Sequence, residues 1–331
     1  MTPTSLGLPF ADVELEARVR AKLLEVEKEL ASAVESEFDF VNEAAHHLLE
    51  AGGKRFRPLL VVLAAEFGDP RSAGVVPAAL VVELTHLATL YHDDVMDEAE
   101  LRRGAPSANA RWDNSIAILT GDFLFARASQ IVADLGPDAV RIQAETFARL
   151  VQGQIRETVG PRPTGHALSH YLSVVADKTG SLIATSARLG ARLSEASRAH
   201  EDSLTDFGEH IGTAFQLSDD IIDVASEATD LGKTPGTDLR EGVLTLPTLL
   251  ALQSPDESDT RLRKLLAGPL LDDESHREAL TLLRAHPAMG QAHDVVERHT
   301  AAARAALDAL PDVPARNALS ALCDLVLTRT S

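Results

Sequence analysis

Cysteine is almost absent from this sequence, since Cys323 is the single cysteine among 331 residues. One cysteine excludes an intramolecular disulfide framework and a cysteine-rich zinc site, and it fits a reducing compartment. Positive charge is also scarce, because 31 Lys and Arg residues face 50 Asp and Glu residues, for a formal net charge of −19. So acidic a chain repels nucleic acid, and we expect no nucleic-acid partner. A phosphate-bearing ligand would need local basic clusters or metal ions.

Targeting and membrane-spanning signals are missing as well. Residues 1–20 lack the basic start and apolar block of a secretory signal. The nearest approach to an uncharged apolar run of spanning length, residues 73–90, is interrupted by Pro77, Glu83 and His86. We therefore expect a cytoplasmic protein without a transmembrane span. Peripheral contact with a bilayer is compatible with the sequence.

Aromatic residues make up only 4% of the chain, and alternating β-branched runs are few, which disfavours strands. Apolar residues recur at helical spacing in most segments, so the pattern predicts an all-α fold with one domain. We expect a helical extension over residues 1–30 and the domain itself over 31–331. The polar segment 226–242 is the longest predicted loop. The predicted helices cover residues 12–35, 38–50, 57–68, 77–97, 110–135, 137–158, 166–192, 199–225, 246–253, 258–267, 273–285, 290–309 and 314–329.

Two aspartate clusters of the same form, Asp-Asp-x-x-Asp, end two of the apolar helices. The clusters consist of Asp93, Asp94 and Asp97, and of Asp219, Asp220 and Asp223. Carboxylates four residues apart share a helix face and repel, and near a helix C-terminus they also oppose the helix dipole. Bound Mg²⁺ would relieve both effects, because it takes oxygen ligands from one or two carboxylates together with substrate phosphates. The alternative is a solvated acidic face, which explains one such cluster better than two.

Basic residues gather near these clusters although they are scarce elsewhere. Lys54, Arg55 and Arg57 follow a glycine pair, and Arg102-Arg103 follows the first cluster. Each group alone could be a solvated surface feature, and a double arginine after an acidic cluster could also be a helix-capping ion pair. Together they suggest that Arg and Lys bind one diphosphate directly while metal ions link another to aspartate.

The set of motifs, in this order and spacing, resembles the all-trans polyprenyl diphosphate synthases. The resemblance covers about residues 30–330. It rests on Gly53–Pro58 (GKRFRP), residues 86–104 (HLATLYHDDVMDEAELRRG), Gly121-Asp122, Lys178-Thr179-Gly180 and residues 215–247 (FQLSDDIID, LGK, DLREG, TLP). One departure is visible, because many relatives carry a lysine where Val243 stands here. Its loss would leave diphosphate binding more dependent on Lys233.

The resemblance implies an isoprenoid-synthase-type helical bundle around a deep central cavity, as a homodimer. It implies head-to-tail condensation of isopentenyl diphosphate with an allylic diphosphate through an allylic carbocation. The implied ligands of three Mg²⁺ ions that hold the allylic diphosphate are Asp93, Asp94, Asp97, Asp219 and Asp223, with Asp220 in the same catalytic motif. The residues implied for isopentenyl diphosphate are Lys54, Arg57, His86 and Arg103, and those for the allylic substrate are Arg102, Lys178, Thr179, Gln216 and Lys233.

Product length should depend on the side chains one turn and more before Asp93, which we expect to face down the cavity. Ala88 and Thr89 are small there, and Leu84 and Thr85 on the preceding turn are not aromatic. One helical turn of 5.4 Å spans roughly one isoprene unit. We therefore expect a product of six to ten units, as in a quinone side chain. Phe123 is the candidate for a bulky floor from another helix.

Other functions compete with this hypothesis. A geranylgeranyl diphosphate synthase would share every motif and differ in the cavity floor. A class I terpene cyclase would have no use for the predicted isopentenyl diphosphate residues. A non-catalytic partner subunit of a heteromeric synthase should lose one aspartate cluster, whereas both are complete here. A helical scaffold protein would leave the clusters unexplained.

Overall fold

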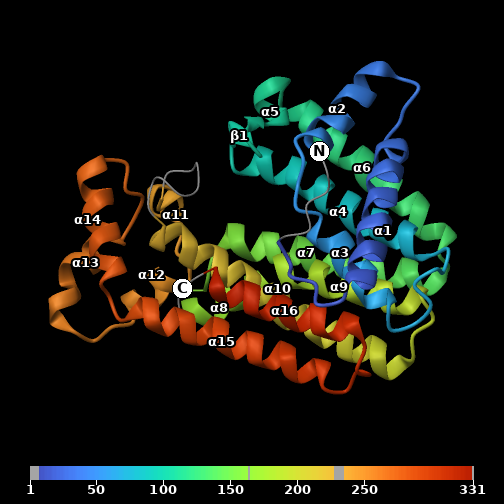
Figure 1. The fold of residues 1–331 in the computed structure, drawn as a ribbon. Helices are drawn as coiled ribbons and strands as arrows, with labels where there is room; N and C mark the ends of the chain where they lie inside the picture. Colours follow the sequence, from blue (N-terminus) through green and yellow to red (C-terminus); the bar gives the residue numbers. More distant parts are fainter. Residues whose placement is uncertain (1–6, 163–164, 227–234, 330–331) are drawn as a thin grey trace. The chain divides into compact units, whose positions relative to one another are not determined.

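The structure is a computed structural model that describes residues 7–162, 165–226 and 235–329 (Figure 1). Helices make up almost all of its regular structure, so the predicted all-α class is confirmed. The strands found in the described residues are β1 (Leu101–Arg102) and β2 (Ala105–Pro106), which pair antiparallel in a short hairpin. No predicted long helix is missing from these ranges.

The chain divides into two compact units. The first comprises the described residues of Met1–Ala148, Leu182–Gly208 and Ala306–Ala321, and the second those of Arg149–Ser181, Glu209–Ala305 and Leu322–Ser331. The first aspartate cluster belongs to the first unit, and the second cluster belongs to the second. The extension over 1–30 and the domain over 31–331 stay predictions.

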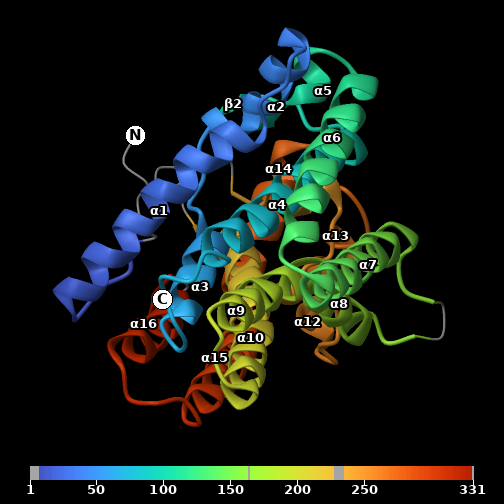
Figure 2. The ribbon, with the colours of Figure 1, turned by 90° about the vertical axis from the view of Figure 1, so that its right-hand side faces the viewer.

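In the first unit, α4 (Val75–Met96) is the helix around which the others pack. Its sequence is apolar on nearly every face, and a helix of that kind is stable only when it is surrounded. It contacts α1 (Val13–Ala33), α3 (Phe56–Ala65), α5 (Ala108–Arg111) and α6 (Asn114–Asp134) (Figure 2). The same unit contains α2 (Asp39–Glu50).

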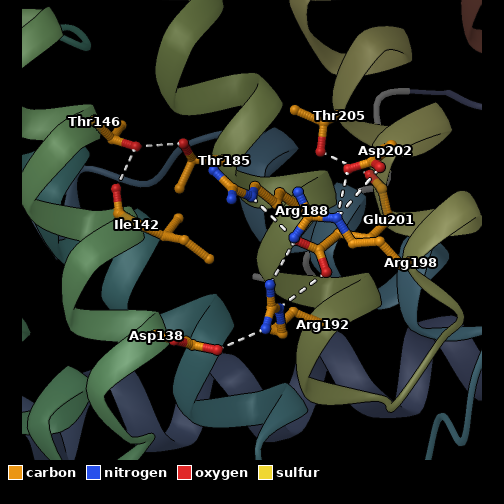
Figure 3. Close-up of polar contacts among 10 residues, drawn as sticks. All are labelled: Asp138, Ile142, Thr146, Thr185, Arg188, Arg192, Arg198, Glu201, Asp202 and Thr205. Atoms are coloured by element: carbon orange, nitrogen blue, oxygen red, sulfur yellow. Dashed lines mark hydrogen bonds and ion pairs between the residues drawn. The ribbon is translucent and has the colours of Figure 1, made fainter.

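A buried glutamate ties two later helices of the first unit together. Glu201, near the start of α10 (Arg198–Ala225), is 2% exposed. Arg188 of α9 (Ser181–Leu193) donates to it from Nε at 3.1 Å, and Arg192 lies at 2.9 Å (Figure 3). Arg198 lies at 3.6 Å from the same carboxylate. A carboxylate this buried needs such partners, since an unpaired charge in the core is strongly destabilising.

The second unit has its own apolar core, formed by side chains that include Val224, Leu239, Ala251 and Leu283. Short helices carry most of these residues, with α13 packed against α14 (Figure 1). The helices are α8 (Ala167–Val175), α11 (Thr237–Glu241), α12 (Leu246–Leu252), α13 (Thr260–Leu265), α14 (Asp273–Arg284), α15 (Ala288–Leu307) and α16 (Pro314–Thr328), with a 3₁₀ turn at Glu257–Asp259. Several helices are divided between the two units, each with one part in the first and one in the second, and these include α7 (Pro137–Val159), α10, α15 and α16.

Two of the described helices, α4 and α6, are long and apolar enough to cross a bilayer by length and composition. Their mean hydropathies are 1.3 and 1.4, and 72% of the apolar window of α4 is buried against 33% of that of α6. The apolar composition of α4 is explained by its burial as a core helix. Burial does not explain the apolar composition of α6, because its residues Ile118 and Leu119 are 42% and 62% exposed.

Candidate functional site

The first aspartate cluster lies at the C-terminal end of α4, as the sequence predicts. Asp93 and Asp94 are in its last turn, and Asp97 is the residue that caps it. The exposure of the three side chains differs, because Asp94 is buried, Asp93 is half-buried and Asp97 is exposed. All three carboxylates sit where helix carbonyl groups already concentrate negative charge. This arrangement favours a cation at the helix end.

Arg102 of the β1–β2 hairpin is the partner of the buried aspartate. Its Nε donates to Oδ1 of Asp94 at 2.6 Å, which matches the ion-pair alternative that the sequence left open. The second oxygen, Oδ2, is buried and has no hydrogen-bond partner among the described residues. Burial raises the pKa of Asp94, although the charge of Arg102 opposes that rise. A carboxylate oxygen that is buried and unpaired fits a metal ligand.

No group of three or more carboxylate, imidazole or thiol side chains in the described ranges is close enough to hold a metal ion alone. Mg²⁺ keeps several waters and is typically held by one or two carboxylates together with substrate phosphates. The buried, unpaired Oδ2 of Asp94 fits such a ligand.

A basic site lies beside the start of α3 in the first unit. Arg55 is not a free cation of this site, because its side chain is buried. It is paired with Glu27 and, at 3.0 Å, with Glu83. Burial lowers the pKa of the Arg57 guanidinium to about 10, and the positive charge of Arg103 acts in the same direction. The Nε of Arg57 is buried without a hydrogen-bond partner among the described residues. Such a group needs an anion.

His86 and Arg103 belong to the same basic site. Burial, followed by the charges of Arg57 and Arg103, lowers the pKa of His86 well below its ordinary value, so the imidazole is neutral at pH 7. Arg103 donates from Nη1 to the carbonyl groups of Leu48, at 3.0 Å, and of Gly52. These bonds hold its side chain beside the end of α2. Lys54 is exposed next to this group.

His92 links α4 to α6. Its Nε2 lies 3.1 Å from the carbonyl oxygen of Ile118 on α6. A Cβ added to Gly121 would lie 2.3 Å from that nitrogen and 3.0 Å from the carbonyl oxygen of Ala88. Glycine at position 121 therefore allows α6 to approach α4 closely just before the aspartate cluster.

The residues predicted to set product length lie on α4 and α6. Leu84, Thr85 and Ala88 are buried, whereas Thr89 and Phe123 are half-buried. The neighbouring Phe125 stacks on Phe147 of α7, with ring centroids 4.0 Å apart. The roles of these residues stay predictions.

The second aspartate cluster ends α10 in the second unit. Arg329 donates from Nη2 to Oδ1 of Asp219 at 2.6 Å. Asp223 accepts the backbone N–H groups of Thr237 and Asp238 at 3.2 and 3.3 Å, and so holds the start of α11. The sequence analysis did not predict that Arg329 contacts the second cluster. A cation near the end of an acidic chain was the one signal that could have indicated such a contact.

Asp220 is the buried member of the second cluster. Tyr171 of α8 donates its hydroxyl to Oδ2, and Gln216 donates from Nε2 to Oδ1 at 3.1 Å. Burial, with the charges of Asp238 and Asp223, raises the pKa of Asp220 well above its ordinary range. Both of its oxygens are engaged by protein groups, so Asp220 holds Gln216 and Tyr171 in place. Tyr171 was not anticipated from the sequence.

A cavity of about 500 Å³ within the second unit is lined by three of the five predicted allylic-substrate residues, and Arg102 is not among its lining residues. Lys178, Thr179 and Gln216 line it together with Asp220 and Tyr171. Thr179 donates from Oγ1 to Oε1 of Gln216 at 3.2 Å, and Lys178 donates to Glu157 at 2.6 Å. The polar wall of the cavity thus holds two hydrogen-bonded groups, Lys178 with Glu157 and Thr179 with Gln216 and Asp220. Lys233 lies outside the described residues.

Lys178 and Thr179 stand on a π-helical turn, Ala176–Gly180, which interrupts the continuous helix expected over 166–192. Such turns are rare and occur frequently at functional sites. Arg149 and Arg156 of α7 both contact the carboxylate of Asp177, in the first case at 3.2 Å. A Cβ on Gly153 would lie 2.8 Å from the backbone nitrogen of Lys178, so α7 lies directly against the turn.

Comparison with known proteins agrees with these observations. The family model described as polyprenyl synthetase matches residues 38–283. The nonaprenyl diphosphate synthase of Mycobacterium tuberculosis is 51% identical over 331 residues, which is 99% of this chain and 99% of that protein.

Two solved structures are similar over nearly their whole length. A geranylgeranyl pyrophosphate synthase from Corynebacterium glutamicum, complexed with calcium and isoprenyl diphosphate, is 48% identical with a TM-score of 0.89, covering 98% of this chain and 99% of that chain. A decaprenyl diphosphate synthase from Rhodobacter capsulatus is 33% identical with a TM-score of 0.87, covering 96% and 99%. The expected isoprenoid-synthase type of fold is confirmed.

Proposed function

The chain belongs to the polyprenyl synthetase family, and on this basis we propose that it is a long-chain all-trans polyprenyl diphosphate synthase. It is an enzyme, a prenyltransferase that condenses isopentenyl diphosphate head-to-tail with an allylic diphosphate. The single observation that carries the proposal is the completeness of the site, because both aspartate clusters and the basic site are present in one chain.

The basic site of the first unit would bind isopentenyl diphosphate. Arg57 has a buried Nε without a hydrogen-bond partner among the described residues, and Arg103 is held in place by backbone carbonyl groups before an anion arrives. Neutral His86 can donate a hydrogen bond without adding to the repulsion between the two arginines. Exposed Lys54 would complete the set.

The aspartate clusters would hold Mg²⁺, and we propose three ions. Asp93, Asp94 and Asp97 of the first unit are the expected ligands, together with Asp219 and Asp223 of the second. When bound, the metal acts as a Lewis acid that stabilises negative charge on the departing diphosphate. In this account Asp220 orients Gln216, and Arg102 fixes one oxygen of Asp94 so that the other stays available.

The wall formed by Lys178, Thr179 and Gln216 would contact the allylic diphosphate. Its groups are prearranged by Glu157, Asp220 and the π-helical turn, so little reorganisation is needed when the substrate binds. Lys233 belongs to the same proposal, although it lies outside the described residues. No side chain needs to act as a nucleophile.

Small side chains at Ala88 and Thr89 support a product of six to ten isoprene units, as does the identity to the nonaprenyl synthase. The geranylgeranyl alternative has less support, although several of the similar solved structures are geranylgeranyl pyrophosphate synthases. The partner-subunit alternative finds no support in the chain, because neither aspartate cluster is lost.

We further propose a cytoplasmic homodimer that contacts membranes only peripherally for product release. The exposed apolar side chains of Ile118 and Leu119 on α6 support self-association, since burying them against a second copy would remove apolar surface from water.

The test is a condensation assay with Mg²⁺, labelled isopentenyl diphosphate and farnesyl diphosphate. We expect Asp93→Ala and Asp219→Ala each to lower turnover by about 10²-fold or more, as expected for loss of a preorganised electrostatic contact. Asp134→Ala, at the surface end of α6, is the matched control and should keep full turnover. Unchanged turnover in either cluster variant would contradict the assignment.

A further inference from the structure

The β1–β2 hairpin of the first unit places Arg103 in a turn that is unfavourable for an arginine. Arg103 and Gly104 form the two-residue turn that joins the strands. Both have positive φ, 53° and 79°, which is typical of a type I′ turn. Arginine rarely adopts that conformation, and a hairpin of two short strands is at best marginally stable alone. The position of Arg103 therefore depends on contacts outside the hairpin.

Contacts outside the hairpin hold each of its parts. The first strand and the turn have the partners described above, Asp94 for Arg102 and carbonyl groups at the end of α2 for Arg103. The second strand is held by His47 of α2, whose Nε2 lies 2.7 Å from the carbonyl oxygen of Pro106. A carbonyl oxygen can only accept a hydrogen bond, so Nε2 carries the proton and donates it. The end of α2 thus holds both the turn and the second strand.

His47 is itself held in the orientation that this bond requires. Arg111 of α5 points Nη1 at its Nδ1, 3.0 Å away. A guanidinium can only donate, so Nδ1 is the acceptor of the ring and Nε2 the donor. Glu43, one turn before His47 on α2, pairs with the same guanidinium. The ring of Trp112 packs edge-on against the imidazole, with ring centroids 5.1 Å apart. These contacts fix both the tautomer and the ring plane of His47.

We propose that His47 is a positioning residue for isopentenyl diphosphate, because it holds the second strand and thereby the turn that presents Arg103. This inference rests on the proposed function, in which Arg103 binds that substrate. A residue in an unfavourable backbone conformation keeps it only while its surroundings hold it there. Loss of the His47 bond lets the turn relax and displaces the guanidinium of Arg103. Arg102 keeps its own ion pair with Asp94, so contacts with the allylic substrate are disturbed less.

Variants at position 47 separate the hydrogen bonds from the volume of the side chain. His47→Leu keeps a side chain of similar size and removes donor and acceptor, whereas His47→Gln keeps both. His46→Leu is the matched control, because neighbouring His46 donates from Nδ1 to the carbonyl oxygen of Asn42 in its own helix, at 2.9 Å.

The first measurement is steady-state kinetics of the purified full-length proteins with Mg²⁺. Isopentenyl diphosphate is varied at saturating farnesyl diphosphate, and then the reverse. We expect His47→Leu to raise the KM for isopentenyl diphosphate about 5- to 10-fold, the equivalent of one lost hydrogen bond. Its KM for farnesyl diphosphate should stay near the wild-type value. His47→Gln and His46→Leu should resemble the wild type for both substrates.

Hydrogen exchange measured by mass spectrometry without substrate tests the hairpin contact independently of turnover. The backbone N–H of Ser107 donates to the carbonyl oxygen of Glu100 at 2.9 Å, at the base of the hairpin. We expect peptides that cover residues 100–107 to exchange about 5- to 10-fold faster in His47→Leu, since a lost anchor favours local opening. The other two variants should exchange at the wild-type rate.

The proposal is overturned if the hairpin of His47→Leu exchanges like that of the wild type, or if its KM for isopentenyl diphosphate is unchanged. It is equally overturned if His47→Leu raises both KM values alike, since that result indicates a general structural role. Equal impairment of His47→Gln and His47→Leu would also overturn it, because glutamine retains both hydrogen-bonding groups. A wild type that makes no prenyl chain would overturn the proposed function, and the exchange rates would then still decide whether His47 holds the hairpin.

Discussion

Arg102 donates from Nε to Oδ1 of Asp94 at 2.6 Å, across the turn that follows α4. The carboxylate is fully buried, whereas the side chain of Arg102 is 28% exposed. The hairpin that carries Arg102 therefore pairs with the buried member of the aspartate cluster and neutralises its charge. The family resemblance implied that Arg102 contacts the allylic substrate, and the structure shows that it also pairs with Asp94.

Replacing Arg102 by alanine should destabilise the protein, because it leaves a buried carboxylate without its ion pair. We expect the free energy of unfolding to fall by about 2 kcal/mol, less than for a fully buried pair because solvent screens Arg102. Urea denaturation measures the loss. The double variant Arg102→Ala/Asp94→Asn should recover part of it, and equal stability of Arg102→Ala and wild type would contradict this role.

His86 should make stability depend on pH. Its pKa in the folded state lies below the unfolded value of about 6.5, so the unfolded chain binds more protons as the pH falls below that value. The stability that depends on a neutral imidazole is fully present above about pH 6.5 and is lost on acidification. The free energy of unfolding should then fall by at most about 1.4 kcal/mol per pH unit. Urea denaturation between about pH 7 and pH 5 measures this slope. His86→Gln should flatten it, and equal slopes in both proteins would show that His86 does not titrate as described.

Gly153→Ala should disturb the wall that we assign to the allylic diphosphate. The added Cβ would lie 2.8 Å from the backbone nitrogen of Lys178, so the π-helical turn has to move. Displacing positioned groups by about 1 Å can cost about 10²-fold in rate, and we expect kcat/KM to fall by about 10- to 100-fold, mainly through KM for the allylic substrate. Gly290→Ala on α15 is the control, because its Cβ would meet nothing within 4 Å. Equal kinetics of the two variants would contradict the assignment.

The sequence predicted every long helix and both aspartate clusters, because apolar periodicity and carboxylates at helix ends are local signals. The β1–β2 hairpin, α5 and α11 were missed, since each is a few residues long and depends on contacts such as the N–H groups that Asp223 accepts. The π-helical turn was predicted as ordinary α-helix. The turn lies against α7 at Gly153, a contact that no local pattern reveals.

The site was only partly predictable, for a similar reason. The resemblance to the polyprenyl diphosphate synthases implied Lys178, Thr179 and Gln216, and the structure brings them to one cavity. Tyr171 and Arg329 act through partners that are distant in sequence, Asp220 and Asp219. Arg55 looked like a third cation beside Lys54, but buried Glu83 neutralises it.

Leu119→Glu should weaken the proposed homodimer. Leu119 is 62% exposed on α6, and a charge placed in an apolar interface would be buried without a partner. Light scattering coupled to size-exclusion chromatography should show a dimer for the wild type and a shift toward monomer for the variant. Leu271→Glu, at a side chain that is 82% exposed outside α6, should remain dimeric. A monomeric wild type, or a variant as dimeric as the wild type, would contradict the proposed interface.

The most direct test of the account is the chain length made by the wild-type enzyme. Purified protein is incubated with Mg²⁺, labelled isopentenyl diphosphate and farnesyl diphosphate, and the dephosphorylated product is compared with prenyl alcohols of known length. The small side chains at Ala88 and Thr89 predict a main product of about six to ten isoprene units, at roughly one unit per helical turn. A product that stops at geranylgeranyl diphosphate would contradict the long-chain assignment and would place a floor close to the aspartate cluster.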